Sequence, residues 1–562
     1  MQACLSSAAA AIWSEESPAA GTPAGTVVVR AAGLRVHGMT VTPGSGVPSA
    51  GELAVFCRPV ITAPAVIRRD GTVLADAWLP DLVRLGELER HLGDGVIEAA
   101  VDAAVAAGRL RPRQRRRIMS YPLVIRLMLA TGLMPDASYC ETLARLAGLL
   151  ADIPFVLEWH VPTEKVVTDW RLPVPPSLME DLFWQAAGPL ISDDEPSAVM
   201  LAGMPVAAAD GMLVSLADTP ANRAFFGTTG TADDSAPFPQ LRIVAVTARA
   251  GRAMLGAILG QAGAGEQTLL KRLVKRRPDL VAGRAICFDR NFPGYDLITA
   301  ILDAGGHVIA RVKEGISLGF QDGPGRGWLP DGSRMTWLNA PSGKNQDRLP
   351  VRAAEHNAIL PRGDGTEETS QTCTLITTLL DHEAAPAQAV RDTYLTRWSA
   401  SETTFGEDKT TITGAGNRTS GPVLRSGSPR LVIQEAWAWL TATQLVRASA
   451  AEALRTAAAA VRALRRRDQA PLAADQESFT ASRHHMIRSM TSSQVTATSS
   501  LEALAAAADA AARAALHTLN VPGRQRHSKR AQKARPKFPH ATATKTTITE
   551  RPQVQVFAPG FP

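Results

Sequence analysis

Three acidic residues, Asp210, Asp289 and Glu402, occur where carboxylates could share metal ions. Asp210 follows the apolar run 206–209, Asp289 follows the run 284–288, and Glu402 lies in a segment of helical character. Two Mg²⁺ ions about 3.5–4 Å apart can activate a water and stabilise a leaving oxygen in phosphodiester cleavage. Mg²⁺ takes a few carboxylate oxygens together with water and phosphate. We therefore predict that these acids are the catalytic metal ligands. The alternative for each aspartate is an ordinary cap or turn residue.

The elements around these acids follow a recognisable order. Apolar alternation and helical periodicity predict five strands, at 206–209, 241–247, 253–259, 284–288 and 307–313, and two helices, at 266–277 and 295–304. A further helix is expected to begin near Pro386 and to carry Glu402. Three strands, a helix, a strand, a helix, a strand and a final helix are typical of an RNase H-like fold, which is an α/β fold with a mixed five-stranded sheet. Residues 315–380, rich in Gly, Pro and Asp, predict a β subdomain inserted before the last helix.

The segment from Tyr394 to Lys409 reads YLTRWSASETTFGEDK. Its Tyr394, Arg397, Glu402 and Lys409 resemble the Y-R-E-K signature of bacterial DDE transposases of the insertion-sequence-four group. Motifs in the order typical of this group accompany the signature; they are Asp210-Gly211 with Asp218–Asn222 and Phe226-Gly227, then Asp289–Phe292, then Arg311–Lys313, and finally Leu424–Pro429. The resemblance covers roughly residues 82–450.

The resemblance implies a transposase that binds the terminal inverted repeats of an insertion sequence. Such an enzyme cleaves at the ends of the element and joins the 3′ ends to target DNA by phosphoryl transfer. It implies Mg²⁺ as cofactor, two ions in number with Mn²⁺ as the alternative, double-stranded DNA as partner, and a dimer on that DNA. Asp210, Asp289 and Glu402 would be the metal ligands. The residues expected to contact DNA are Tyr394, Arg397, Lys409, Arg290, Arg311 and Lys313.

One departure from the family pattern lies inside the signature. Four residues separate Arg397 from Glu402 here, whereas the family has three. In a regular helix the two side chains would then lie about 140° apart. We therefore expect a one-residue bulge between Trp398 and Ser401, which would restore the register. Bulges of this kind are frequent at functional sites. The nearby Glu407 and Asp408 are rival third acids, but we expect them to be solvated helix charges, since neither has the seven-residue spacing to Lys409.

The rest of the chain divides by composition. We predict a poorly ordered arm at 1–78, a helical DNA-binding domain at 79–195, the catalytic core at 196–450, C-terminal helices at 451–520 and a basic tail at 521–562. Within the later segments, helices are expected at 432–445, 448–467 and 500–518. An arginine run at 109–117 is either a solvated face or a phosphate contact. Its predicted DNA-binding members are Arg113, Arg115, Arg116 and Arg117.

Composition sets broad limits on function. The chain has 562 residues, a net charge of +7 and an ordinary apolar content of 45%, so an anionic partner fits it. Its five cysteines are far apart and form no C-x-x-C motif, which fits a reducing compartment. No clean apolar stretch of about 18 residues occurs, and we predict no membrane span. The expected location is the bacterial cytoplasm, in association with the nucleoid.

Two other functions remain open at this point. The chain could be a catalytically inactive DNA-binding relic of a transposase, or a general RNase H-like nuclease with no mobile element. The insertion also offers Trp328 and Trp337, either of which could stack on an unpaired base. The alternative for both is a surface or core tryptophan.

Overall fold

The computed structural model describes most of the chain between residues 85 and 491. The described residues are 30–31, 34–35, 66–67, 73–74, 479–491 and 85–464, the last range with gaps at 86, 94, 113–118, 136, 148–161, 188–199, 231–237, 250–251, 314–317, 321–326, 341–347, 357–358, 362–366, 370–372, 396, 398–404, 406 and 408–422. The bulge expected between Trp398 and Ser401 and the tail at 521–562 lie outside them. Among the described residues, none of the helices combines the length and apolar character needed to cross a lipid bilayer.

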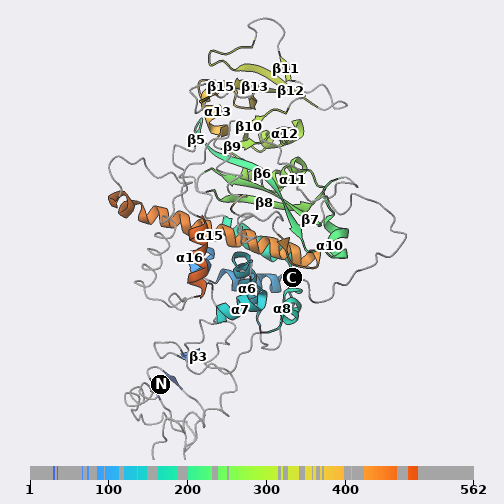
Figure 1. Ribbon diagram of the computed structural model, residues 1–562, viewed down its shortest axis with the longest axis vertical. Coiled ribbons are helices and arrows are strands. Elements are labelled where there is room, and N and C mark those ends of the chain that lie inside the picture. The colour runs from blue at the N-terminus through green and yellow to red at the C-terminus, as the bar shows by residue number, and fades with distance from the viewer. Residues whose placement is uncertain are drawn as a thin grey trace, which may run out of the picture.

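A mixed sheet forms the centre of the molecule (Figure 1). Its core strands are β6 (Met204–Leu216), β7 (Gln240–Ala248), β8 (Met254–Gln261), β9 (Ala285–Phe288) and β10 (His307–Arg311). They lie in the order β8-β7-β6-β9-β10, in which β6, β7 and β8 are antiparallel and β6, β9 and β10 are parallel. This order and these directions are consistent with the RNase H-like fold expected from the sequence.

The segment between β10 and the next helix extends this sheet. Its strands are β11 (Leu318–Phe320), β12 (Arg334–Asn339), β13 (Arg348–His356), the pair β14 (Ile359–Pro361) and β15 (Glu367–Thr369), and β16 (Cys373–Thr377). Strand β16 pairs antiparallel with β10, and β13, β12 and β11 follow outward. With the short β5 (Met200–Leu201) and β17 (Val423–Leu424) paired to β6, the described part of this sheet has 11 strands. The expected five-stranded sheet is therefore wrong in its extent, because β16 and the strands beyond it continue the ladder of β10.

Helices cover both faces of the sheet. On one face α11 (Glu266–Arg276), followed by the short 3-10 helix η4 (Pro278–Leu280), and α12 (Tyr295–Asp303) bury their apolar residues against alternate residues of β6, β9 and β10. On the other face α13 (Ala387–Leu395) packs against the remaining alternate residues of the same strands. The apolar stripe of α11 produces this packing, since its leucines share one side and its Lys and Arg residues the other.

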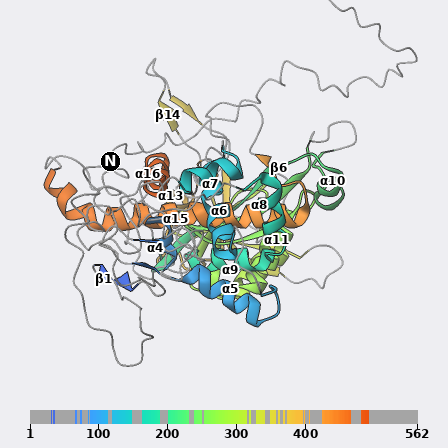
Figure 2. The same cartoon turned by 90° about the horizontal axis from the view of Figure 1, so that it is seen from below.

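A helical layer covers the part of this second face formed by β6, β7 and β8. Its members are α4 (Glu87–Leu92), α5 (Val96–Ala106), α6 (Tyr121–Leu133), α7 (Tyr139–Ala147), α8 (Glu164–Arg171), α9 (Pro176–Ala187), α10 (Pro220–Phe226), α15 (Pro429–Leu464) and α16 (Phe479–Thr491). Figure 2 shows α15 running across this layer. The helices before residue 188 share one apolar cluster with α15 and with the sheet. Helix α15 is continuous, so the break expected between 445 and 448 is wrong, because the alanines that follow carry the helix on.

Two short strand pairs precede these helices. Strands β1 (Arg30–Ala31) and β2 (Leu34–Arg35) pair antiparallel, as do β3 (Val66–Ile67) and β4 (Val73–Leu74). The expected arm at 1–78 otherwise lies outside the described residues.

A glycine sets the closest approach between α6 and α15. A Cβ added at Gly132 would lie 3.0 Å from the Cα of Trp439. We expect Gly132→Val to lower the free energy of unfolding by about 1–3 kcal/mol, because overpacking moves rigid backbone. Denaturant unfolding measures this loss, and Gly132→Ala should lose less. Equal stability of Gly132→Val and the wild type would contradict the close packing.

Candidate active site

The two aspartates predicted as metal ligands lie on neighbouring parallel strands. Asp210 lies within β6, and Asp289 directly follows β9. The register pairs Ala208 with Cys287, and two further steps align Asp210 with Asp289. Neighbouring strands lie about 4.8 Å apart, and partners in parallel strands point to the same face. The structure thus brings the two carboxylates together. It corrects one detail, because β6 does not end at Asp210 but continues to Leu216.

Helix α13 and Arg397 lie on the same face as these acids. Val390 and Tyr394 of α13 pack with Ala208 and Cys287, the residues two positions before the aspartates. The Arg397 guanidinium is 4% exposed, and its Nη1 lies 3.9 Å from Oδ2 of Asp210. It also lies over the Tyr394 ring, 5.6 Å from the ring centroid. Arg397, two residues beyond α13, therefore lies beside Asp210.

Negative charge is concentrated around Asp210. Burial, the largest cause, and the nearby charges of Asp289 and Glu266 together raise the pKa of Asp210 to about 6. The Gly211 N–H, which donates to Oδ1 of Asp210 at 2.8 Å, and the Arg397 charge oppose this rise. A divalent cation would relieve the cost of this buried carboxylate, because it favours the charged form.

Glu266 is a third acid near this pair, and the sequence did not single it out. It begins α11 on the opposite face of the sheet, and its carboxylate accepts from Nη1 of Arg242 at 2.6 Å. Burial and the charge of Asp289 raise the pKa of Glu266, although Arg242 opposes the rise. The absence of a side chain at Gly211 permits this approach, since an added Cβ would lie 2.5 Å from Oε1 of Glu266. The sequence signal that could have indicated this approach is Gly211, which directly follows Asp210.

Among the described residues, the carboxylates of Asp210 and Asp289 are suitable ligands for Mg²⁺. Carboxylate oxygens are the ligands this ion prefers, and a buried carboxylate with a raised pKa, as at Asp210, favours a bound cation. Within the described ranges, no three His, Cys, Asp or Glu side chains come close enough to hold a metal ion. Glu402, the predicted third ligand, lies outside the described residues. Asp289 also makes a local turn, because its Oδ1 accepts from the Asn291 N–H at 2.7 Å.

The residues predicted to contact DNA fall into three groups. Arg290 and Lys313 are exposed, and Arg311, at the end of β10, is half-buried. Tyr394 and Arg397 are buried beside Asp210, and burial raises the pKa of Tyr394 to about 12. The remaining predicted residues lie outside the described part of the chain; they are Lys409, Arg113, Arg115, Arg116 and Arg117.

Two of the motifs that carried the resemblance are joined by hydrogen bonds. The buried Asn222 amide donates to the carbonyl of Ser426 at 3.0 Å, and the Thr219 hydroxyl donates to the carbonyl of Gly427 at 2.8 Å. Thr219 also caps α10 by accepting from the Asn222 N–H. Thr219 and Asn222 therefore connect the start of α10 to the loop before α15.

Glu407 is a half-buried ion-pair partner of two buried arginines, and the expectation of a solvated charge is wrong for it. Its Oε1 accepts from Nη1 of Arg252 at 2.6 Å, and its Oε2 accepts from Nη1 of Arg447 at 3.2 Å. Both arginines are 1% exposed. One arginine comes from the turn between β7 and β8, and the other comes from α15. Glu407 is thus withdrawn from solvent by residues distant in the sequence, which its local sequence could not indicate. Asp408 lies outside the described residues.

The insertion tryptophans differ in exposure. Trp328 is 54% exposed, and the Arg334 guanidinium lies 5.5 Å from its ring centroid. Trp337, in β12, is half-buried against Gly319. Trp328 thus has the more exposed ring of the two.

Comparison with known proteins gives only distant structural likenesses. No protein-family model matches the chain, and no curated protein matches it. Among solved structures, a cryo-electron-microscopy structure of piggyBac transposase in a synaptic complex with hairpin DNA is similar at 10% sequence identity and a TM-score of 0.35. That likeness covers 72% of this chain and 80% of the other.

Proposed function

We propose that the chain is a DDE transposase of the insertion-sequence-four group, which cleaves DNA at the ends of an insertion sequence and joins the 3′ ends to target DNA. One observation supports this most strongly. Asp210 lies in β6, Asp289 directly follows the adjacent parallel strand β9, and Arg397 lies 3.9 Å from Asp210 on the face that α13 covers. An acid pair at the centre of such a sheet suits metal-assisted phosphoryl transfer.

In this proposal Asp210, Asp289 and Glu402 hold two Mg²⁺ ions. The ions would supply an activated nucleophile and would stabilise the charge on the leaving oxygen. Arg397 keeps a fixed positive charge beside Asp210 and so favours the ionised carboxylate that metal binding needs. The exposed Arg290 and Lys313 would contact the backbone of the bound DNA, together with Tyr394 and Lys409 near the terminal phosphates.

The protein would act on double-stranded DNA as a dimer. The arginines at 113–117 and the basic tail would add salt-dependent affinity for the phosphate backbone, with the helical segment before the sheet contacting the terminal repeats.

The direct test uses DNA that carries the inverted repeats flanking the coding region. We expect Mg²⁺-dependent nicking at the repeat ends, followed by joining of the new 3′ ends to a second duplex. Gel analysis of end-labelled DNA measures both steps, and the same duplex with scrambled repeats is the control. Equal cutting of repeat and scrambled DNA would favour a general nuclease. Binding without cutting, in Mg²⁺ or Mn²⁺, would favour an inactive relic.

A further inference from the structure

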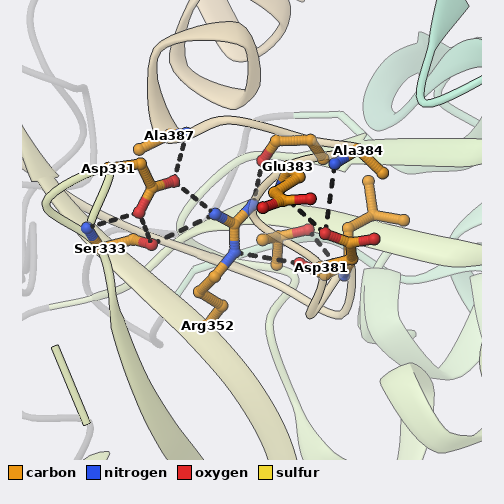
Figure 3. Close-up of polar contacts among 10 residues, drawn as sticks. Asp331, Ser333, Arg352, Asp381, Glu383, Ala384 and Ala387 are labelled. Atoms are coloured by element: carbon orange, nitrogen blue, oxygen red, sulfur yellow. Dashed lines mark hydrogen bonds and ion pairs between the residues drawn. The ribbon is translucent and has the colours of Figure 1, made fainter. Parts of the chain in front are cut away.

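A buried arginine, Arg352 of β13, lies where the inserted strands meet the start of α13 (Figure 3). Its side chain is 1% exposed. Nη1 donates to Oδ2 of Asp331 at 2.7 Å and to the Ser333 hydroxyl at 3.1 Å. Nε donates to the carbonyl of Leu379 at 3.1 Å, and Nη2 donates to the carbonyl of Ala385. One guanidinium thus joins a turn of the insertion to both ends of the loop 379–385.

Asp331 completes this connection at the helix itself. Its Oδ2 accepts from the backbone N–H of Ala387, the first residue of α13, at 2.8 Å. The first N–H groups of a helix have no partner within the helix, and a carboxylate there is favoured by the helix dipole. Asp331 is therefore a cap supplied from 56 residues earlier in the chain.

The charge of Asp331 is maintained by its neighbours. Burial works to raise its pKa, but the Ser333 hydroxyl and N–H, the Ala387 N–H and the Arg352 charge hold the pKa of Asp331 below its usual range. It is thus an anion at neutral pH, as the contact with Arg352 requires. The loop beside it is ordered by Asp381, whose Oδ1 accepts from the N–H groups of Glu383 and Ala384.

Helix α13 connects this anchor to the acid pair. Its first residue is held by Asp331, and its Val390 and Tyr394 pack on the sheet beside β6 and β9. Arg397, two residues beyond the helix, lies 3.9 Å from Asp210. A shift or loosening of the first turn would therefore move the arginine relative to the carboxylate, since a helix transmits motion along its axis.

We propose that Asp331 and Arg352 are positioning residues that hold α13, and through it Arg397, against Asp210. This inference rests on the proposed function for its catalytic consequence, but the mechanical anchor can be measured without it. The strands between β10 and α13 then have a role besides any contact with DNA, because their turn at 331–333 holds the helix that precedes Arg397.

The test compares Asp331→Ala, Asp331→Asn and the wild type in the full chain. We expect amide hydrogen exchange of the α13 peptide to rise about tenfold in Asp331→Ala, because a charge-assisted bond to the helix start is lost. Nicking at saturating repeat DNA should fall about 10²-fold while the dissociation constant for that DNA stays within about twofold, since misplacement costs rate more than binding. The Asp331→Asn variant retains an acceptor for the Ala387 N–H, so it should recover part of both losses.

The matched control is Asp279→Ala, which removes an exposed carboxylate from its pair with Arg277, 2.7 Å away. It should change neither exchange in α13 nor nicking. Exchange in Asp331→Ala equal to that of the wild type would overturn the anchor. Faster exchange with an unchanged nicking rate would overturn the positioning role. If Asp331→Ala does not unfold cooperatively, the comparison uses Asp331→Asn and the wild type, with the same measurements of exchange in α13 and of nicking rate. A wild-type protein that nicks no DNA would overturn the proposed function. Hydrogen exchange in α13 would still show whether Asp331 holds the start of that helix.

Discussion

Asp289→Asn and Asp210→Asn are each expected to lower Mg²⁺-dependent nicking at the repeat ends by at least about 10³-fold. The metal contributes several kcal/mol of charge stabilisation, and each 1.36 kcal/mol corresponds to a factor of ten in rate. The amide keeps the size of the side chain but removes the charge that holds the cation. Single-turnover nicking of end-labelled DNA measures the loss, and binding of the same DNA should persist.

The control for this pair is Asp303→Asn, which changes an exposed aspartate at the end of α12. It should nick at the wild-type rate. Activity of Asp289→Asn within about tenfold of the wild type would remove Asp289 from the metal site, and with it the strongest support for the proposed chemistry.

Glu407→Ala is expected to lower the free energy of unfolding by about 3–5 kcal/mol. The substitution leaves the buried guanidinium groups of Arg252 and Arg447 without the carboxylate that faces both. Removing one member of a buried ion pair is costly, because the remaining charge stays out of water. Denaturant unfolding monitored by circular dichroism measures the change. Glu407→Gln should lose less, since its amide oxygen still accepts one hydrogen bond.

An exposed ion pair provides the comparison for Glu407. Asp181→Ala removes the carboxylate that lies 3.1 Å from Nη1 of Arg109, and both side chains are more than a third exposed. Surface pairs contribute about 1 kcal/mol or less. If the two alanine variants lost the same stability, the burial of the Glu407 pair would have no energetic consequence.

The core strands were predictable because each is a short run of mostly apolar residues. All five expected core strands exist, and the structure places two of the three predicted catalytic acids, Asp210 and Asp289, beside one another. The length of β6 was not predictable from its own residues, since Asp210-Gly211 is a weak strand pair in isolation. Pairing with β7 from Ala207 through Ser215 keeps the strand intact there.

The polar contacts that hold the site could not be predicted, because they join residues distant in sequence. Arg352 and Asp331 are separated by 21 residues, and Glu407 lies 155 residues from Arg252. Each is an ordinary charged residue in its local sequence, where a solvated surface position is the usual environment. Only the pairing of the inserted strands with β10, and the passage of α15 across the sheet, bring these charges together.

The position of α15 also has a consequence for synthesis of the chain. The apolar faces of α6 and α9 are covered by a helix that begins at Pro429, about 240 residues after α9 ends. At about 5–20 residues per second, a ribosome needs roughly ten seconds to a minute to make that length. During this interval the first helices present uncovered leucines and tryptophans to the cell. Full burial of the amino-terminal helices therefore waits for synthesis of α15, and we expect chaperones to bind the nascent chain until then.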